Sequence, residues 1–268
     1  DNENGYYFIT EKGEKISNDS YYSAQKFSDG LAPVKYNYGG NYIYIDKDGL
    51  PAITKGYENA EPFFDGLAAV ENNNYWGFIN KNGEEVVPLR FGATSGIYTN
   101  NLIAVSDEFD WDAKWYYVDN NGKTAFNENL KYDNAEPFFD GLAAVEIGDR
   151  WRFINTNGEY EFTKSFDQTD GFSEGLAAVR DDNELWGYIN KKGEYTIISQ
   201  YLSANEFTNG IAEVIFTDEN WGYIDKNGQE IWRSSEPSNI YYRNKSRSIS
   251  SDDKSNRKKY IERATRLK

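Results

Sequence analysis

The chain has 268 residues, a net charge of −15, and neither Cys, His nor Met. Without Cys and His it can form no disulfide, no thiolate metal site and no Ser–His or Cys–His nucleophile pair. No run approaches the ~18 apolar residues of a membrane span, whereas the aromatic content of 17% indicates a β-rich core built on rings.

Two short sequence frames alternate along the chain. The first joins an aromatic residue, a turn dipeptide and a Leu-Ala-x-Val strand, and its copies lie 36, 35, 40, 34 and 35 residues apart. These copies are FSDGLAPV at 27–34, FFDGLAAV at 63–70, YTNNLIAV at 98–105, FFDGLAAV at 138–145, FSEGLAAV at 172–179 and FTNGIAEV at 207–214. Self-similarity at a fixed period is the signature of a repeat architecture.

The second frame follows the first after a short loop and is an aromatic strand that ends in a glycine turn. Its copies are YYFITEKG at 6–13, YIYIDKDG at 42–49, WGFINKNG at 76–83, WYYVDNNG at 115–122, WRFINTNG at 151–158, WGYINKKG at 186–193 and WGYIDKNG at 221–228. The sequence therefore predicts about six and a half copies of a unit of about 35 residues.

Each unit is predicted to be a three-stranded meander. In the unit at 57–88, the first strand is Leu-Ala-Ala-Val, and the second alternates between two faces over 76–79. A tight turn ends at Gly83, where a positive φ suits glycine, and a third strand over 84–87 is expected to stop at Pro88. Residues 57–64 are predicted to be the crossover between units.

These frames resemble the WG-repeat family of bacterial tandem-repeat proteins. Residues 66–88, GLAAVENNNYWGFINKNGEEVVP, match the family pattern throughout, and the resemblance covers about 5–232. It implies an interaction or structural module without an assigned reaction. The first position of the Trp-Gly pair is always aromatic, whereas Gly is replaced in several copies, as expected if the ring is a packing residue.

The residues predicted to build the repeats form two sets. The repeat-core aromatics are Tyr42, Trp76, Trp115, Trp151, Trp186 and Trp221. The turn glycines are Gly49, Gly83, Gly122, Gly158, Gly193 and Gly228. An aromatic that recurs once per unit could instead form a stacking platform for sugar rings. A single repeat cannot bury its own faces, however, so we expect these rings to lie in the core between repeats.

The predicted fold is all-β: a tandem array of meander repeats in an open, solenoid-like stack, with a closed β-propeller as the alternative. Propeller blades usually have four strands and about 40–45 residues, which favours the open stack. Residues 1–232 are assigned to the array, and residues 233–268 to a polar, basic linker and tail that is partly helical.

One loop is longer than its equivalents. The first hairpin of the third copy contains SDEFDWDAK at 106–114, and Trp111 stands there outside both frames. Since loops that grow on a regular scaffold often carry function, Trp111 is a candidate contact residue together with its neighbours Phe109 and Asp110.

Metal, cofactor and catalytic sites are not expected. The turn Asp46-Lys47-Asp48-Gly49 has acidic residues but places Gly fourth, whereas a calcium-binding EF-hand loop needs it sixth. Turn chemistry therefore explains these residues, and no cofactor is predicted. Carboxylate pairs could support glycoside chemistry, but in so acidic a chain their proximity carries no information, and we expect no enzyme.

The charge is divided between the two parts of the chain. Residues 233–268 hold eleven Lys and Arg against four Asp and Glu. Residues 1–232 therefore hold eighteen Lys and Arg against forty Asp and Glu. An acidic body is unsuited to nucleic acid, and the basic tail could dock on that body or on another anionic surface.

Three functions remain open. The first is an extended acidic surface for a protein or peptide partner, in particular a basic one. The second is a carbohydrate or cell-envelope module that binds a polysaccharide through exposed aromatics, and the third is a structural spacer. A monomer or part of a longer chain is expected, and a signal peptide before Asp1 would direct the protein to the envelope or outside the cell.

Overall fold

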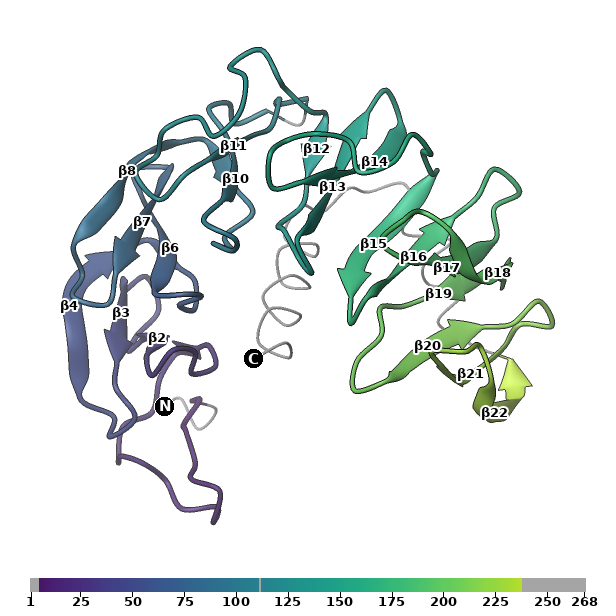
Figure 1. Cartoon of the computed structure of the whole chain (residues 1–268). Helices are drawn as coiled ribbons and strands as arrows, with labels where there is room; N and C mark the ends of the chain where they lie inside the picture. Colours follow the sequence, from purple (N-terminus) through teal and green to yellow (C-terminus); the bar gives the residue numbers. More distant parts are fainter. Residues whose placement is uncertain (1–4, 111, 238–268) are drawn as a thin grey trace. The chain divides into compact units, whose positions relative to one another are not determined.

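The computed structural model describes residues 5–110 and 112–237. Within these ranges the chain forms 22 strands in six antiparallel sheets and contains no helix. Each sheet corresponds to one repeat, and its strands follow one another as a meander (Figure 1). The predicted all-β array of meander repeats is therefore confirmed.

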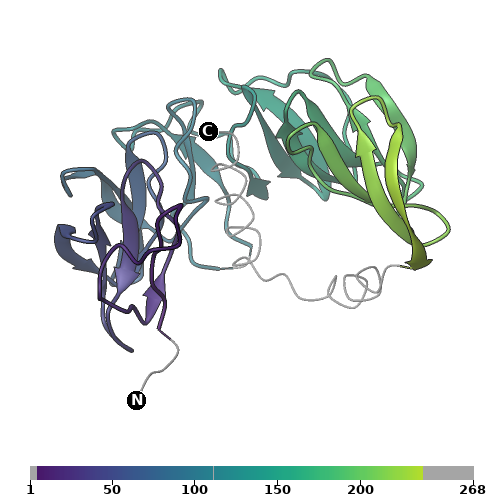
Figure 2. The same cartoon turned by 90° about the horizontal axis from the view of Figure 1, so that it is seen from below.

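The chain divides into two compact units, and each holds three sheets. Figure 2 shows the strands of these sheets from a second direction. The sheets of unit 1 (described residues 5–110 and 112–128) are β1(Ser23–Ala24)–β2(Ala32–Lys35)–β3(Tyr42–Ile45)–β4(Pro51–Tyr57), β5(Asn59–Ala60)–β6(Leu67–Asn72)–β7(Tyr75–Asn80)–β8(Glu85–Phe91), and β9(Ala93–Thr94)–β10(Ile103–Ser106)–β11(Tyr116–Val118). The sheets of unit 2 (residues 129–237) are β12(Asn134–Ala135)–β13(Leu142–Ile147)–β14(Arg150–Asn155), β15(Gln168–Ser173)–β16(Leu176–Arg180)–β17(Trp186–Ile189)–β18(Tyr195–Tyr201), and β19(Ser203–Ala204)–β20(Ile211–Ile215)–β21(Asn220–Asp225)–β22(Glu230–Pro237).

The predicted crossover contributes a further strand. In the second sheet β5 pairs with β6, with Asn59 opposite Glu71 and Ala60 opposite Val70. Buried backbone amides need partners, and the crossover finds them on the neighbouring strand. An opening strand of this kind begins every sheet: β1, β5, β9, β12 and β19 have two residues each, and β15 has six. Four sheets therefore have four strands, and the two that lack a full outer strand have three.

The third predicted strand does not stop at Pro88. Strand β8 continues to Phe91, and its register against β7 shifts between Trp76 and Phe78. Because β8 is an edge strand, a proline without an N–H group is tolerated in this irregular stretch. The bulged backbone crosses close to Gly77, where a Cβ atom would lie 2.6 Å from the carbonyl oxygen of Val87.

The same crowding explains the glycine of the Trp-Gly pair. A Cβ atom on Gly187 would lie 2.7 Å from the carbonyl oxygen of Ile197. In the two sheets that lack a full outer strand, Tyr116 and Arg152 occupy the equivalent position. Strand β3 has Ile43 there and keeps the shifted register, so glycine favours the outer strand without being essential for it.

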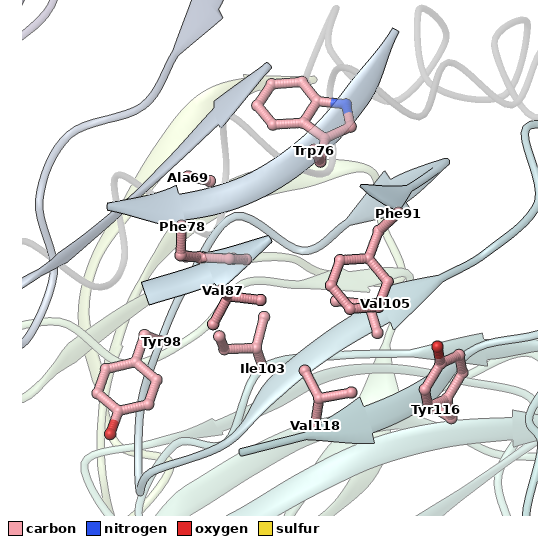
Figure 3. Close-up of a cluster of buried hydrophobic side chains, with 10 residues drawn as sticks. All are labelled: Ala69, Trp76, Phe78, Val87, Phe91, Tyr98, Ile103, Val105, Tyr116 and Val118. Atoms are coloured by element: carbon pink, nitrogen blue, oxygen red, sulfur yellow. The ribbon is translucent and has the colours of Figure 1, made fainter. Parts of the chain in front are cut away.

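The core lies between consecutive sheets. Figure 3 shows one cluster, in which Trp76, Phe78 and Phe91 of the second sheet face side chains of the third sheet. The third sheet contributes Ile103, Val105, Tyr116 and Val118, with Tyr98 from the preceding segment. Similar clusters join the other consecutive sheets within each unit.

Within each unit, aromatic side chains also tie neighbouring repeats together. The rings of Tyr44 and Phe63 are 4.9 Å apart, and the Tyr44 hydroxyl donates a hydrogen bond to the carbonyl oxygen of Glu61 at 2.7 Å. In unit 2, Tyr188 and Phe207 are 4.7 Å apart, and the Tyr188 hydroxyl donates to the carbonyl oxygen of Asn205 at 2.8 Å. A buried hydroxyl needs such an acceptor, so these ties position neighbouring repeats.

The ends of the array differ in part from the sequence prediction. The copy at 6–13 forms only isolated bridges, Tyr6 with Tyr21 and Ile9 with Lys15. Strand β22 continues to Pro237, beyond the predicted boundary at residue 232. The predicted tail helix lies outside the described residues, and the preference for an open stack over a closed propeller stays a prediction.

Candidate functional site

The turn before the Leu-Ala-x-Val strand of each repeat has two central residues with positive φ. In unit 1 these residues are Asp29 and Gly30 (52° and 91°), and Asp65 and Gly66 (48° and 84°). Two positive φ values define the type I′ turn, which matches the twist of a hairpin and favours Asp-Gly. We call the first central residues the turn edge: Asp29, Asp65, Asn100, Asp140, Glu174 and Asn209.

Carboxylates of the turn edge bind the turn of the next repeat. Asp29 Oδ2 accepts a hydrogen bond from the Gly66 amide at 2.8 Å, and Asp140 Oδ2 accepts one from the Gly175 amide at 2.7 Å. A carboxylate that accepts a backbone N–H forms one of the stronger protein hydrogen bonds. The acidic residues of these turns thus hold successive repeats in register.

In unit 2 the turn edge also holds lysine side chains of the protein itself. Lys226 Nζ lies 2.9 Å from Glu174 Oε2 and donates a hydrogen bond to the Glu174 carbonyl oxygen, also at 2.9 Å. Lys191 Nζ donates to the carbonyl oxygen of Asp140 at 2.5 Å. Both lysines occupy the second position of a glycine turn, one repeat further along the chain.

The environment of Glu174 keeps its carboxylate ionised. Burial by itself would raise the pKa of this group. Hydrogen bonds from Lys226 and from the amides of Gly210 and Asn209, together with the Lys226 charge, outweigh burial and hold the pKa below its ordinary value. The Glu174 carboxylate thus accepts hydrogen bonds from the Lys226 ammonium group and from two backbone amides.

In unit 1 the turn edge borders an open hollow of about 720 Å³. Its lining consists of Asp29, Asp65, Gly66, Tyr98, Thr99, Asn100 and Asn101. The Tyr98 hydroxyl donates a hydrogen bond to Asn101 Oδ1 at 2.8 Å. Burial, and then the negative charges of Asp65 and Asp119, raise the pKa of Tyr98. We call this feature the turn hollow.

The enlarged loop places two of its three candidate contact residues at the surface. Phe109 is 56% exposed and Asp110 is exposed, whereas Trp111 lies outside the described residues. The Phe109 ring lies 5.3 Å from that of Tyr75 in an edge-to-face arrangement. Phe109 therefore contacts the hairpin tip of the preceding repeat.

The base of the enlarged loop is held against the sheet. The Tyr116 hydroxyl donates a hydrogen bond to Asp107 Oδ1 at 2.6 Å, and burial, followed by that carboxylate, raises the pKa of Tyr116. The loop backbone also passes so close to Gly92 that a Cβ atom there would lie 2.3 Å from the carbonyl oxygen of Glu108. These contacts fix where the loop leaves the sheet.

The predicted core aromatics differ in burial. Trp76 is 7% exposed and belongs to the cluster in Figure 3. The other members of the set are half-buried: Tyr42, Trp115, Trp151, Trp186 and Trp221. Each ring position lies at, or next to, the first residue of a strand. Part of the ring therefore reaches the end of the sheet, and none of the six rings is classed as exposed.

The predicted turn glycines all have positive φ, between 74° and 81°. In the turn before Gly83, Asn80 Oδ1 accepts hydrogen bonds from the amides of Asn82 and Glu84 at 3.0 and 3.1 Å. The polar side chains of these turns therefore bind their own backbone. Among the residues that the structure describes, no group of three or more acidic side chains is arranged to hold a metal ion.

The turn edge was not singled out by sequence reasoning. Its signal was present, because Asp or Glu precedes Gly in four copies of the first frame, at Asp29, Asp65, Asp140 and Glu174. Their contacts with the next repeat could not be inferred, because lysine and acceptor are 51 or 52 residues apart in sequence.

The fold and the linked turns define a class: the chain is a tandem β-repeat protein, whose architecture is that of an interaction or scaffold module and is generally non-enzymatic. The profile of the family described as "WG containing repeat" matches residues 44–76, 76–108, 117–151, 151–184 and 186–216. The chain therefore belongs to the WG-repeat family. No curated protein matches it.

Two solved structures share the fold at low sequence identity. The computationally designed Ika8 protein has a TM-score of 0.52 and 10% identity, and the match covers 83% of this chain and 78% of that one. KlHsv2, with loop 6CD replaced by a Gly-Ser linker, has a TM-score of 0.51 and 11% identity, with 85% and 90% covered. In the part of the chain that the structure describes, no helix is long and apolar enough to cross a membrane.

Proposed function

We propose that the chain is a non-catalytic binding module that takes a basic segment of a protein or peptide partner on its acidic repeat surface. The observation that supports this proposal most directly is the turn edge of unit 2, where Lys226 and Lys191 already place ammonium groups on turn residues. The same carboxylate and carbonyl acceptors suit the ammonium groups of a partner's lysines.

The charge distribution supports the same partner. Residues 5–128 hold eighteen acidic and ten basic side chains, and residues 129–237 hold twenty-one and nine. Each unit is therefore acidic, and a field of one sign accelerates the encounter with an oppositely charged partner. Since an exposed ion pair contributes only about 0.2–1 kcal/mol, useful affinity requires several contacts along the repeats.

The test measures binding of the full chain to a labelled peptide of alternating Lys and Ala by fluorescence anisotropy. Its control is the peptide of alternating Glu and Ala. We expect the Lys peptide to bind at about 0.1 M salt, where the screening length is about 10 Å, and to dissociate at about 1 M, where it is about 3 Å. Failure of the Lys peptide to bind at low salt, or equal binding of both peptides, would overturn the proposal.

A second candidate ligand, a neutral polysaccharide, is favoured by the hairpin tips of unit 1. The stretches 36–45 and 72–80 contain no charged residue. Tyr38 is 84% exposed and forms an edge-to-face pair with Tyr22, and Tyr75 is 43% exposed and pairs with Phe109. Tyr, Asn and Gly together supply rigid contact area and adaptable hydrogen bonds, as they do in antibody loops.

Affinity electrophoresis through gels that contain a neutral glucan would test this second candidate. We expect Tyr38→Ala and Tyr75→Ala to abolish a retardation that persists at high salt. Tyr160→Ala, which removes an exposed tyrosine of unit 2, is the matched control and should leave it unchanged. Equal retardation of all variants, or none for the parent chain, would argue against this ligand.

A further inference from the structure

The outer strands of the sheets differ in how their free edges are protected. Each four-stranded sheet ends in an outer strand, β4, β8, β18 or β22, that pairs with the sheet on one side only (Figure 1). A free edge presents unpaired N–H and C=O groups, and proteins protect it with proline or with charged side chains. Strands β4, β8 and β22 each contain a proline and at least one charged residue, whereas β18, YTIISQY, contains neither. Among the outer strands that the structure describes, β18 is therefore the unprotected one.

The exposed row of side chains on β18 is uncharged and includes a large apolar residue. Thr196, Ile198 and Gln200 alternate along the strand and are exposed, and Ile198 is 70% exposed. Their neighbours point to the opposite face of the sheet, where Ile197 and Tyr201 are buried against the next repeat. Because burial of one row specifies how the strand is oriented, the exposed row is equally well defined.

The backbone of the exposed row points away from the sheet. The Ile197 carbonyl oxygen and the Ser199 amide face Gly187 of β17, since a Cβ atom on that glycine would lie 2.7 Å from each. Successive residues of a strand direct their N–H and C=O groups to alternate sides, so those of Ile198 point to the open edge. There the Ile198 carbonyl oxygen accepts a hydrogen bond from Gln200 Nε2 at 3.4 Å, which is long for such a bond.

The sequence of β18 complements itself when two copies run antiparallel. With Ile198 opposite Ile198 of the second copy, Thr196 lies opposite Gln200, and Tyr195 lies opposite Tyr201. Like charges directly opposite each other destabilise a strand pair, whereas aromatic and branched pairs stabilise it, and this register contains no charge. Two opposite residues that direct their backbone groups toward each other exchange both N–H···O bonds. Every exposed residue of β18 thus finds a suitable partner in the same strand of a second copy.

We infer that two copies of the chain associate through β18, with Ile198 on the two-fold axis of an antiparallel strand pair. This inference goes beyond the proposed function, and it replaces the monomer expected from the sequence. The contact is isologous, so it closes at two copies and leaves no free β18 edge for a third.

Electrostatic repulsion sets the conditions under which this dimer forms. Residues 129–237 hold twenty-one acidic and nine basic side chains, so two copies repel each other at low salt. The screening length falls from about 30 Å at 0.01 M salt to about 10 Å at 0.1 M. Association through β18 should therefore strengthen over this range, whereas salt weakens binding of the Lys-Ala peptide. The two proposals can thus fail independently of each other.

The test is sedimentation equilibrium of the full chain at concentrations up to about 1 mM, because a single strand pair is a small interface and gives a transient dimer. Ile198→Lys places two ammonium groups opposite each other on the axis and should raise the dimer dissociation constant at least about tenfold. Thr54→Lys adds the same charge at the equivalent exposed position of β4. It is the matched control, with an expected change of less than about twofold.

Ile198→Pro tests the backbone contribution. Pro88 already occupies the equivalent position of β8, so the sheet accepts a proline at this point of an outer strand. The substitution removes the N–H group that the pair needs on its axis, and it should weaken the dimer as much as Ile198→Lys does. Melting curves establish that each variant is folded.

Chemical cross-linking tests the register. The chain has no cysteine, so Ile198→Cys introduces a single thiol that a short bismaleimide can join only to a second copy. We expect this variant to form a covalent dimer and Thr54→Cys to form none. Equal cross-linking of the two cysteine variants, equal dimerisation of the two lysine variants, or a parent chain that stays monomeric up to about 1 mM would each overturn the inference.

Discussion

The two units have the same sheets but differ at their surfaces. In unit 2, Lys191 and Lys226 donate hydrogen bonds to the main chain of Asp140 and Glu174 in the turn edge, whereas in unit 1 residues of the turn edge line an open hollow. The hairpin tips of the two units also differ. The first two tips of unit 1 are uncharged and aromatic, whereas those of unit 2 contain runs such as Asp181-Asp182-Asn183-Glu184.

This difference shows where a repeat protein can vary without changing its fold. The buried rings Phe78 and Phe153 occupy equivalent positions in the two units and are both fully buried. Exposed turn and tip residues contact only their immediate neighbours, so a single substitution there changes what the surface can bind. One scaffold can thus carry different surface chemistry on its two units.

The largest expected effect tests whether the two cores are equivalent. Phe78→Ala in unit 1 and Phe153→Ala in unit 2 should each lower the free energy of unfolding of their own unit by about 3–5 kcal/mol, because each leaves a cavity in a packed cluster. Urea denaturation would measure both. The exposed Phe109→Ala is the control, at about 0.5 kcal/mol or less; a loss below about 1 kcal/mol for either core variant would show that its cluster does not stabilise the unit.

The next effect concerns the glycine beneath the bulged strand. Gly77→Ala and Gly187→Ala should each cost about 1–3 kcal/mol, because the new methyl group would overlap the backbone of the crossing strand. Arg152→Ala alters the equivalent position of a sheet that already has a side chain there and should cost less. Thermal unfolding of the three variants would measure these losses of stability. Equal losses for the glycine variants and for Arg152→Ala would contradict the steric explanation.

A smaller effect on the free energy of unfolding, one that depends on pH, is expected in unit 2. The folded-state pKa of Glu174 lies below its ordinary value of 4.5. Between these two pKa values the carboxylate is charged in the folded chain but protonated in the unfolded chain, so unfolding takes up a proton. Glu174 therefore contributes stability above pH 4.5 that is lost as the pH falls through the lower, folded-state pKa. We expect Glu174→Gln to remove a pH-dependent contribution of about 1 kcal/mol.

Urea denaturation between pH 6 and pH 3 would follow this contribution. Lys226→Gln should reduce it, because the ammonium group is one of the causes of the lowered pKa. The exposed carboxylate Glu184→Gln is the control. A pH profile of Glu174→Gln that coincides with that of the parent chain would show that this carboxylate does not contribute.

The smallest effect concerns the exposed ring pair of unit 1. A double-mutant cycle with Tyr75→Ala and Phe109→Ala should give a coupling free energy of about 0.5 kcal/mol, the low end for an edge-to-face pair. Tyr160 of unit 2 is the negative control for coupling to Phe109. Additive losses at Tyr75 and Phe109 would mean that the tip rings do not stabilise each other in solution.

The sequence frames predicted much of the fold because they encode local geometry. Alternation over 76–79 and glycine at position 83 specify a strand and a turn within a few residues. The two-residue strand β5 has no such pattern, since Asn59 and Ala60 are too few to alternate. Pro88 predicts the end of a strand, but its place on an edge strand allows β8 to continue to Phe91.

The candidate site was less accessible to sequence reasoning. The dipeptide Asp65-Gly66 predicts a turn, but a contact with the next repeat depends on how the sheets stack. The half-burial of Trp221 has a similar cause, because the end of a strand is covered only as far as its neighbours extend. The choice between an open stack and a closed ring also depends on stacking, and small-angle scattering would decide it.

The hydrogen bonds from Tyr44 to Glu61 and from Tyr188 to Asn205 each join a repeat only to its successor. A junction of this kind is self-contained: it does not depend on how many copies precede or follow it. Unequal recombination in the gene could therefore insert or delete a copy and leave every remaining junction intact. The length of such arrays is then free to drift between related genes, and with it the number of turns on which selection can act.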